Sequence, residues 1–127
     1  MLDTDISSYI IRKRPASLLE LFQKNAEVLC VSVVTAAELQ FGAEKAGRPA
    51  LKALVNEYLD RLPVLDWTQG VVADYARIRT ALERAGKPIG NMDMLIAAHA
   101  LSEGSTLVTN NLRHFEHVPG LKFEVWQ

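Results

Sequence analysis

Short apolar runs alternate along this chain with segments in which apolar residues recur every three or four positions. The short runs are typical of strands and the longer periodic segments of amphipathic helices. This order of elements predicts an α/β fold with a mainly parallel central sheet flanked by helices. The expected strands are residues 1–4, 29–33, 64–65, 106–109 and 123–125.

Helical periodicity is clearest in the middle of the chain, where glycine and proline mark the ends of the periodic segments. Gly47, Pro63 and Gly86 are expected to close three helices. The segment that starts at Asn91 is apolar on almost every side, which predicts a central, buried helix. The expected helices cover residues 15–25, 35–45, 51–62, 71–82 and 91–101.

The length of 127 residues suits one ordinary domain, and we find no repeat or linker that would divide residues 1–127. Hydrophobic residues make up 49% and charged residues 23%, proportions that exclude a disordered or low-complexity chain. No apolar run approaches the ~20 residues of a membrane span. The start of the chain also lacks the basic and apolar regions of a signal peptide, so we expect a cytoplasmic protein without a membrane partner.

The charge balance is nearly neutral, with 14 Lys and Arg against 15 Asp and Glu. A net charge of −1 argues against nucleic-acid binding by bulk charge, although it leaves room for chemistry at a local site. The single cysteine, Cys30, stands in an apolar run and is expected to be a buried, inert thiol.

Three acidic residues stand at positions that the predicted sheet would bring together. Asp3 ends the first strand, whereas Glu38 and Asp93 lie in the first turns of helices. In parallel α/β sheets, ligands bind beyond the carboxyl ends of the strands, so these side chains are expected at one edge. Clustered carboxylates repel one another, and a hard dication such as Mg²⁺ removes that cost.

Each acid also has a purely structural interpretation. The segment Thr35–Glu38 matches a capping box, in which Glu38 would only accept from a backbone N–H. A carboxylate such as Asp93 is favoured near a helix start by the helix dipole, and Asp3 could cap a short helix that follows it. The metal-site interpretation depends on all three converging from distant parts of the chain.

The segments that carry these acids resemble the signature blocks of PIN-domain ribonucleases, and more narrowly the VapC toxins of bacterial toxin–antitoxin pairs. A fourth block follows in the expected order, so the resemblance covers nearly the whole chain. The four blocks are residues 1–5 (MLDTD), 35–43 (TAAELQFGA), 88–100 (PIGNMDMLIAAHA) and 107–115 (LVTNNLRHF).

The resemblance implies a single PIN domain and an endoribonuclease that depends on Mg²⁺, for which Mn²⁺ may substitute. Asp3, Glu38 and Asp93 match the metal-binding acids of the family, and Thr4 and Thr109 match its small polar residues beside the site.

Two positions depart from the pattern of the family. Asp5 replaces a usual asparagine, and Asn111 stands where a fourth acid is often found, which puts a second metal ion in doubt. Glu116 is close enough in sequence to act through water.

The chemistry we expect is in-line attack of a metal-activated water on an RNA phosphodiester. Asp3 and Asp93 would hold the ion, Glu38 would position or deprotonate the water, and Thr109 and Asn111 would orient water or a phosphate oxygen. The family resemblance implies tRNA as substrate, most closely the anticodon region of initiator tRNA, and inhibition of translation.

The resemblance also implies a VapB-like antitoxin as partner, through which alone the protein would reach operator DNA. The apolar helices 50–62 and 16–25 could form a groove for that antitoxin and a face for a homodimer, or simply pack in the core. A hetero-oligomer with the antitoxin is the other assembly that we expect.

Basic residues near the predicted site are candidates for phosphate contacts, although solvated surface charge is the simpler interpretation. The candidates are Arg12, Lys13, Arg14, Lys87 and Arg113. The arginines of the helix 71–82 region are expected to form surface ion pairs instead. Of the three histidines, His99 is expected in the core, while His114 and His117 lack the spacing of a zinc site.

Two other functions remain compatible with the residues. A receiver-type phosphoacceptor domain would use Asp66 after a strand, but the lysine such a domain needs after residues 107–109 is replaced by Asn110. A catalytically silent PIN-like binding module is left open by Asn111, although the three intact acids argue against it.

Overall fold

A computed structural model describes residues 1–13 and 15–126. Strand β1 pairs in parallel with β2, and β3 pairs in parallel with β4. Leu2 lies between the two pairs and forms parallel bridges to Val31 and to Val108. The described strand order is therefore β2–β1–Leu2–β3–β4, and the parallel direction of every pair confirms the predicted parallel sheet. The strands are β1 Val31–Ser32, β2 Val64–Leu65, β3 Leu107–Val108 and β4 Phe123–Glu124.

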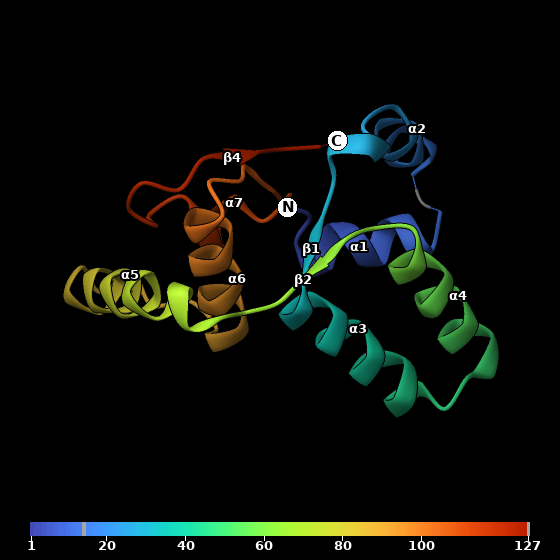
Figure 1. The fold of residues 1–127 in the computed structure, drawn as a ribbon, viewed down its shortest axis with the longest axis horizontal. Helices are drawn as coiled ribbons and strands as arrows, with labels where there is room; N and C mark the ends of the chain where they lie inside the picture. Colours follow the sequence, from blue (N-terminus) through green and yellow to red (C-terminus); the bar gives the residue numbers. More distant parts are fainter. Residues whose placement is uncertain (14, 127) are drawn as a thin grey trace.

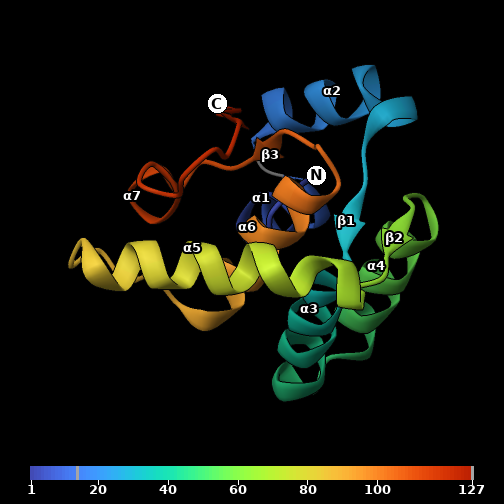
Figure 2. The same cartoon turned by 60° about the vertical axis from the view of Figure 1, so that its left-hand side comes forward.

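Seven α-helices and two short 3-10 helices connect these strands in the described residues. In both ribbon views α5 and α6 lie on one side of β1 and α4 lies on the other (Figures 1 and 2). The elements are α1 Thr4–Ile11, α2 Ala16–Lys24, η1 Ala26–Val28, α3 Val33–Ala46, α4 Pro49–Asp60, η2 Gln69–Val71, α5 Val72–Arg84, α6 Asn91–Ser102 and α7 Leu112–Phe115.

Two hydrophobic clusters cover the two faces of the sheet. Leu2 and Val108 face a cluster built with α1, α2 and α4, whereas Met1 and Leu107 face a cluster built with α5, α6 and α7. Neighbouring residues of a strand point to opposite faces, which explains why residues 1–2 and β3 each contribute to both clusters. Helix α6 is central, as its apolar sequence predicts, because five consecutive residues from Ile96 to Ala100 are fully buried.

The helix ends follow the predicted punctuation, while several starts differ from it. Gly47 closes α3 with a φ of 63°, and Gly86 follows α5 with a φ of 67°, values that favour glycine. The predicted start of α3 at Thr35 is wrong, because Ser32 is the N-cap and Thr35 is buried inside the helix. The predicted first strand 1–4 is also too long, because Thr4 already belongs to α1.

No helix in the described part of the chain is both long and apolar enough to cross a bilayer. The prediction for Cys30 is wrong in part, because the residue is half-buried rather than buried. Its thiol still packs against the cluster of α5, α6 and α7.

Candidate active site

Three chain segments end at the same edge of the sheet and carry the polar residues of the candidate site. Asp3 follows Leu2, Ser32 ends β1 and begins α3, and Thr109 follows β3. Backbone hydrogen bonds fix this register, since Asp3 N–H donates to the Val108 carbonyl at 3.0 Å. Parallel pairing therefore places residues that are remote in sequence at one edge.

Asp3 lies in the centre of this edge and is only 2% exposed. Its Oδ1 accepts from Ile6 N–H at 2.8 Å, so Asp3 caps α1, as the structural interpretation of this residue proposed. Burial raises the pKa of the Asp3 carboxyl to about 6, and the negative charges of Asp5 and Asp93 add to this effect. The Thr109 hydroxyl and the Ile6 N–H offset only part of the increase in this pKa.

Glu38 reaches the same edge from the second turn of α3. The Thr4 hydroxyl donates to Glu38 Oε1 at 2.6 Å and joins α3 to the start of α1. The predicted capping box is wrong, because the cap of α3 is the Ser32 hydroxyl, which accepts from Val34 N–H at 3.1 Å. Glu38 is therefore not used for capping, and its partner is a residue next to Asp3.

Asp93 lies in the first turn of α6, half-buried, and its nearest polar partner is a histidine. Nδ1 of His114 lies 2.6 Å from Asp93 Oδ2, and Nδ2 of Asn111 lies 2.9 Å from the same ring nitrogen. Sequence reasoning missed His114, which it judged only as a zinc ligand. The available signal was its spacing of three residues from Asn111, which places both side chains on one face of a short helix.

Thr109 and Asn111 are the remaining polar residues of the candidate site, and both lie in the turn after β3. Thr109 is fully buried, and its Oγ1 accepts from Asn111 N–H at 2.9 Å. This bond fixes the turn after β3, and the Asn111 side chain is directed to His114. The two remaining acidic candidates lie outside this group. Asp5 is exposed to solvent, and Glu116 lies 3.3 Å from His117 rather than beside Asp93.

The donors at this edge suit a hard divalent cation. Asp3, Glu38 and Asp93 offer oxygen ligands, and no Lys or Arg within residues 1–13 and 15–126 lies at ion-pair distance from any of them. In that same part of the chain, no three His, Cys, Asp or Glu side chains already converge on one point. Glu38 contacts Thr4 instead, and Asp93 contacts His114.

Three of the basic candidates line two grooves beside the acids, whereas Lys13 lines a small cavity between α1, α2 and α4. Arg12 lines a groove of about 400 Å³ between α1, α3 and α4, which also contains Glu38 and which we call the α3 groove. Lys87 and Arg113 line a second groove, of about 690 Å³, beside α7. Arg14 lies outside the described residues.

Of the arginines expected to form surface pairs, Arg77 and Arg79 do so, whereas Arg84 forms no ion pair in the described part of the chain. Arg77 pairs with Asp74 at 3.0 Å and Arg79 with Glu83 at 3.1 Å, both along α5. These exposed pairs contribute little to stability, but they neutralise the outer face of that helix.

Trp67, Trp126 and His99 are packing residues, and for His99 this confirms the predicted place in the core. The Trp67 indole donates to the Leu95 carbonyl at 3.0 Å, and Trp126 is 4% exposed. His99 is fully buried, and its Nδ1 lies 2.7 Å from the Ser32 hydroxyl. His99 thus contacts the residue that caps α3.

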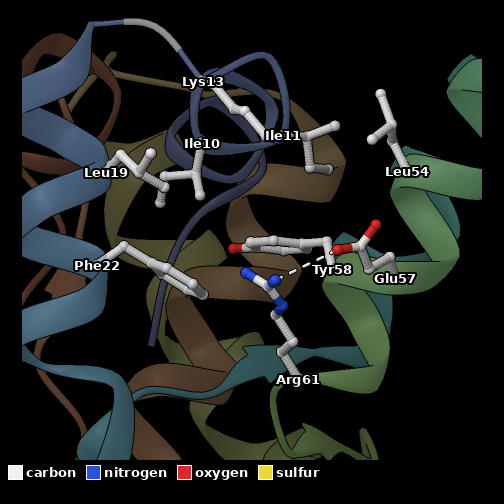
Figure 3. A pocket seen from close by; sticks show the side chains of 9 residues that line it. All are labelled: Ile10, Ile11, Lys13, Leu19, Phe22, Leu54, Glu57, Tyr58 and Arg61. Atoms are coloured by element: carbon white, nitrogen blue, oxygen red, sulfur yellow. Dashed lines mark hydrogen bonds and ion pairs between the residues drawn. The ribbon is translucent and has the colours of Figure 1, made fainter.

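The two apolar helices proposed as a partner groove pack largely against the protein itself. Phe22 of α2 stacks on Tyr58 of α4 with ring centroids 5.7 Å apart, and the Tyr58 hydroxyl donates to Ser7 at 2.8 Å. A cavity of only about 40 Å³ remains between these helices and α1, with Arg61 and Glu57 paired at its edge (Figure 3). Core packing therefore accounts for most of these residues.

Comparisons with known proteins agree with this architecture. The sequence model of the PIN domain family matches residues 1–121. Ribonuclease VapC2 of Haemophilus influenzae is 46% identical over 99% of this chain and 96% of its own length. The tRNA(fMet)-specific endonuclease VapC of Shigella flexneri is 42% identical over the same shares.

Solved structures show the same fold in complexes. DNA-bound VapBC from Salmonella typhimurium superimposes with a TM-score of 0.95 at 41% identity, over 100% of this chain and 97% of that chain. VapBC2 from Rickettsia felis, bound to a DNA fragment from its promoter, gives a TM-score of 0.94 at 37% identity, over 100% and 98% of the two chains. With its parallel sheet and its acidic edge, the chain belongs to the PIN-domain family and, within it, to the VapC ribonucleases.

Proposed function

We propose that this protein is a toxin of a VapBC-type pair that hydrolyses RNA phosphodiester bonds with the help of Mg²⁺ or Mn²⁺. The observation that carries the proposal is the buried Asp3 carboxylate, whose charge has no Lys or Arg partner among the described residues. A buried carboxylate without a counter-ion is costly, and a divalent ion bound between it and two further acids would remove that cost. Asp3, Asp93 and Glu38 would hold the ion.

When bound, the ion supplies Lewis-acid activation of water and neutralises charge on the phosphate. Thr4 holds Oε1 of Glu38, which leaves Oε2 to accept a proton from the attacking water. Thr109 and Asn111 would orient this water or a phosphate oxygen from the turn after β3. The expected products carry a 3′-hydroxyl and a 5′-phosphate.

The substrate we propose is tRNA, and more narrowly the anticodon region of initiator tRNA. This choice is supported by the name of the Shigella flexneri relative, a tRNA(fMet)-specific endonuclease. Cleavage there would inhibit translation. The receiver-domain alternative is excluded by the family, and a silent PIN-like module would require Asp3, Glu38 and Asp93 to be dispensable.

We propose a VapB-like antitoxin as the partner that neutralises the enzyme. The similar structures from Salmonella typhimurium and Rickettsia felis are VapBC complexes bound to DNA. Operator DNA would be reached only through the antitoxin, and the free chain would form a homodimer. Light scattering of the isolated chain that shows a monomer at micromolar concentration would contradict the homodimer.

Cleavage of bulk tRNA tests the activity directly. The purified chain should cut tRNA with added Mg²⁺ and stop with EDTA, and Asp3→Asn, Glu38→Gln and Asp93→Asn should each reduce the rate by at least about a hundredfold. Asp74→Asn is the matched control, because it makes the same chemical change on the outer face of α5. Undiminished cleavage in EDTA or in the three variants would refute the mechanism, and mapping of new 5′-phosphate ends would identify the cleavage site.

A further inference from the structure

The larger of the two grooves beside the acids, which we call the α7 groove, has a volume of about 690 Å³. It lies between residues 86–90, which connect α5 to α6, and the residues of α7 and the turn that follows it. Its basic side chains are Lys87 and Arg113, both exposed, together with His114 and His117.

The α7 groove is continuous with the candidate active site. His114 lines the groove and contacts Asp93 Oδ2 at 2.6 Å, so one side chain belongs to both. Gly90 is the second link, since a Cβ atom added there would lie 3.9 Å from Asp93 Oδ2. A strand that occupies the groove would therefore pass beside the Asp93 carboxylate.

Two basic side chains of this groove carry positive charge that no nearby acid neutralises in the described residues. Within residues 1–13 and 15–126, neither Lys87 nor Arg113 forms an ion pair, whereas Arg77 and Arg79 on α5 are paired. Glu116 is the only acid that lines the groove, and it is directed to His117 at 3.3 Å. Lys87 and Arg113 are therefore available to an anionic ligand.

The α3 groove has a different balance. Arg12 and Arg48 line it, but so do Asp5 and Glu38, so its formal charges cancel. A polyanion is consequently favoured in the α7 groove over the α3 groove by simple charge complementarity.

We propose that the α7 groove binds the sugar–phosphate backbone of the RNA strand beside the scissile bond, with Lys87 and Arg113 each contacting a phosphate. The inference rests on the proposed ribonuclease function and adds to it the path of the substrate. Such contacts position a strand without reading its bases, which explains how a protein of net charge −1 binds RNA through a local patch.

Salt dependence of RNA binding tests the proposal. The parent protein is the Asp3→Asn variant, which blocks cleavage and keeps an oxygen to cap α1. The probe is a fluorescein-labelled 12-nucleotide single-stranded RNA, and anisotropy gives the association constant between about 50 and 250 mM KCl. Each phosphate contact on a single strand contributes about 0.7 to the slope of log K against log[salt].

In that parent, Lys87→Ala and Arg113→Ala should each reduce the slope by about 0.7 and weaken binding roughly tenfold. Arg113→Lys should keep the slope of the parent, because it retains the charge. Arg77→Ala, which removes an arginine that is already paired, should change neither quantity.

An unchanged slope in a variant that combines Lys87→Ala with Arg113→Ala, or an equal loss in Arg77→Ala, would overturn the proposal and leave the groove to a protein partner. Absence of RNA binding by the parent would overturn it as well. Metal-dependent cleavage of tRNA by the unaltered chain is measured separately, so a failure of the groove is distinguishable from a failure of the proposed function.

Discussion

Nδ1 of His114 lies 2.6 Å from Oδ2 of Asp93, so this carboxylate has a basic side chain as its partner. Nδ2 of Asn111 lies 2.9 Å from the same ring nitrogen, so the Asn111 amide and the Asp93 carboxylate compete for it. A metal ion that uses Asp93 must therefore compete with His114 for Oδ2.

Removal of this competitor should strengthen metal binding. His114→Ala is expected to raise the affinity of the metal-free protein for Mn²⁺ roughly two- to fivefold, a small effect because both partners are partly exposed to solvent. Isothermal titration or the electron paramagnetic resonance signal of free Mn²⁺ measures it, with His117→Ala as the control histidine. A loss of affinity would show instead that the imidazole itself is a ligand.

The bond from Thr4 to Glu38 should matter for turnover more than for binding. Thr4→Val keeps the shape of the side chain but removes the donor to Glu38 Oε1, and we expect kcat to fall roughly tenfold with KM little changed. Thr4→Ser should restore most of the rate because it returns the hydroxyl. Steady-state cleavage of labelled tRNA gives both constants, and a change confined to KM would contradict this role.

Apolar periodicity and the terminal glycines were sufficient to predict the parallel sheet, the buried α6 and the ends of α3 and α5. The starts of helices were harder, since Ser32 and Thr35 are both good caps and only packing decides between them. Strand lengths were overestimated because apolar residues next to a strand also pack when they belong to a turn or a helix.

The placement of the three acids near one sheet edge was predictable because Asp3 ends a strand and Glu38 and Asp93 lie near the starts of helices. Their partners were not, since the contacts of Thr4 with Glu38 and of His114 with Asp93 join residues 34 and 21 positions apart. Such pairs depend on where α1, α3, α6 and α7 cross the sheet edge, which no local pattern encodes.

The raised pKa of Asp3 predicts how stability changes with pH. The folded protein holds a proton on Asp3 up to about pH 6, while the unfolded chain loses it near 3.8. Protonated Asp3 therefore contributes to the free energy of unfolding at low pH. This contribution, roughly 3 kcal/mol, is lost as the pH rises from about 4 to 6. Urea unfolding of the metal-free protein across this range measures the loss.

Asp3→Asn should abolish this component and raise the metal-free stability at pH 7.5, because the amide oxygen can still cap α1. Added Mg²⁺ should stabilise the unaltered chain but not the variant. Asp3→Ala is the control for the cap, and we expect it to be about 1 kcal/mol less stable than Asp3→Asn. Identical pH profiles for Asp3→Asn and the unaltered chain would contradict the burial argument.

His99 should give a pH dependence of the opposite sign. Burial lowers the pKa of its imidazole, and the charges and carbonyl of Glu103 and Asp66 offset only part of this. The unfolded chain therefore takes up a proton near pH 6.5 before the folded protein does, so the stabilising contribution of neutral His99 is present above pH 6.5 and is lost as pH falls.

Two variants separate this effect from that of Asp3. His99→Gln should remove the loss of stability below pH 6.5, while the pH dependence that Asp3 causes should remain. Ser32→Ala removes both the cap of α3 and the partner of His99 Nδ1, and it should lower the free energy of unfolding by roughly 2–3 kcal/mol at pH 7.5. His99 Nε2 has no hydrogen-bond partner among the described residues, so the Ser32 hydroxyl at Nδ1 is the hydrogen-bonding contact on which the buried ring depends. A Ser32→Ala protein as stable as the unaltered chain would show that solvent reaches His99 and replaces that contact.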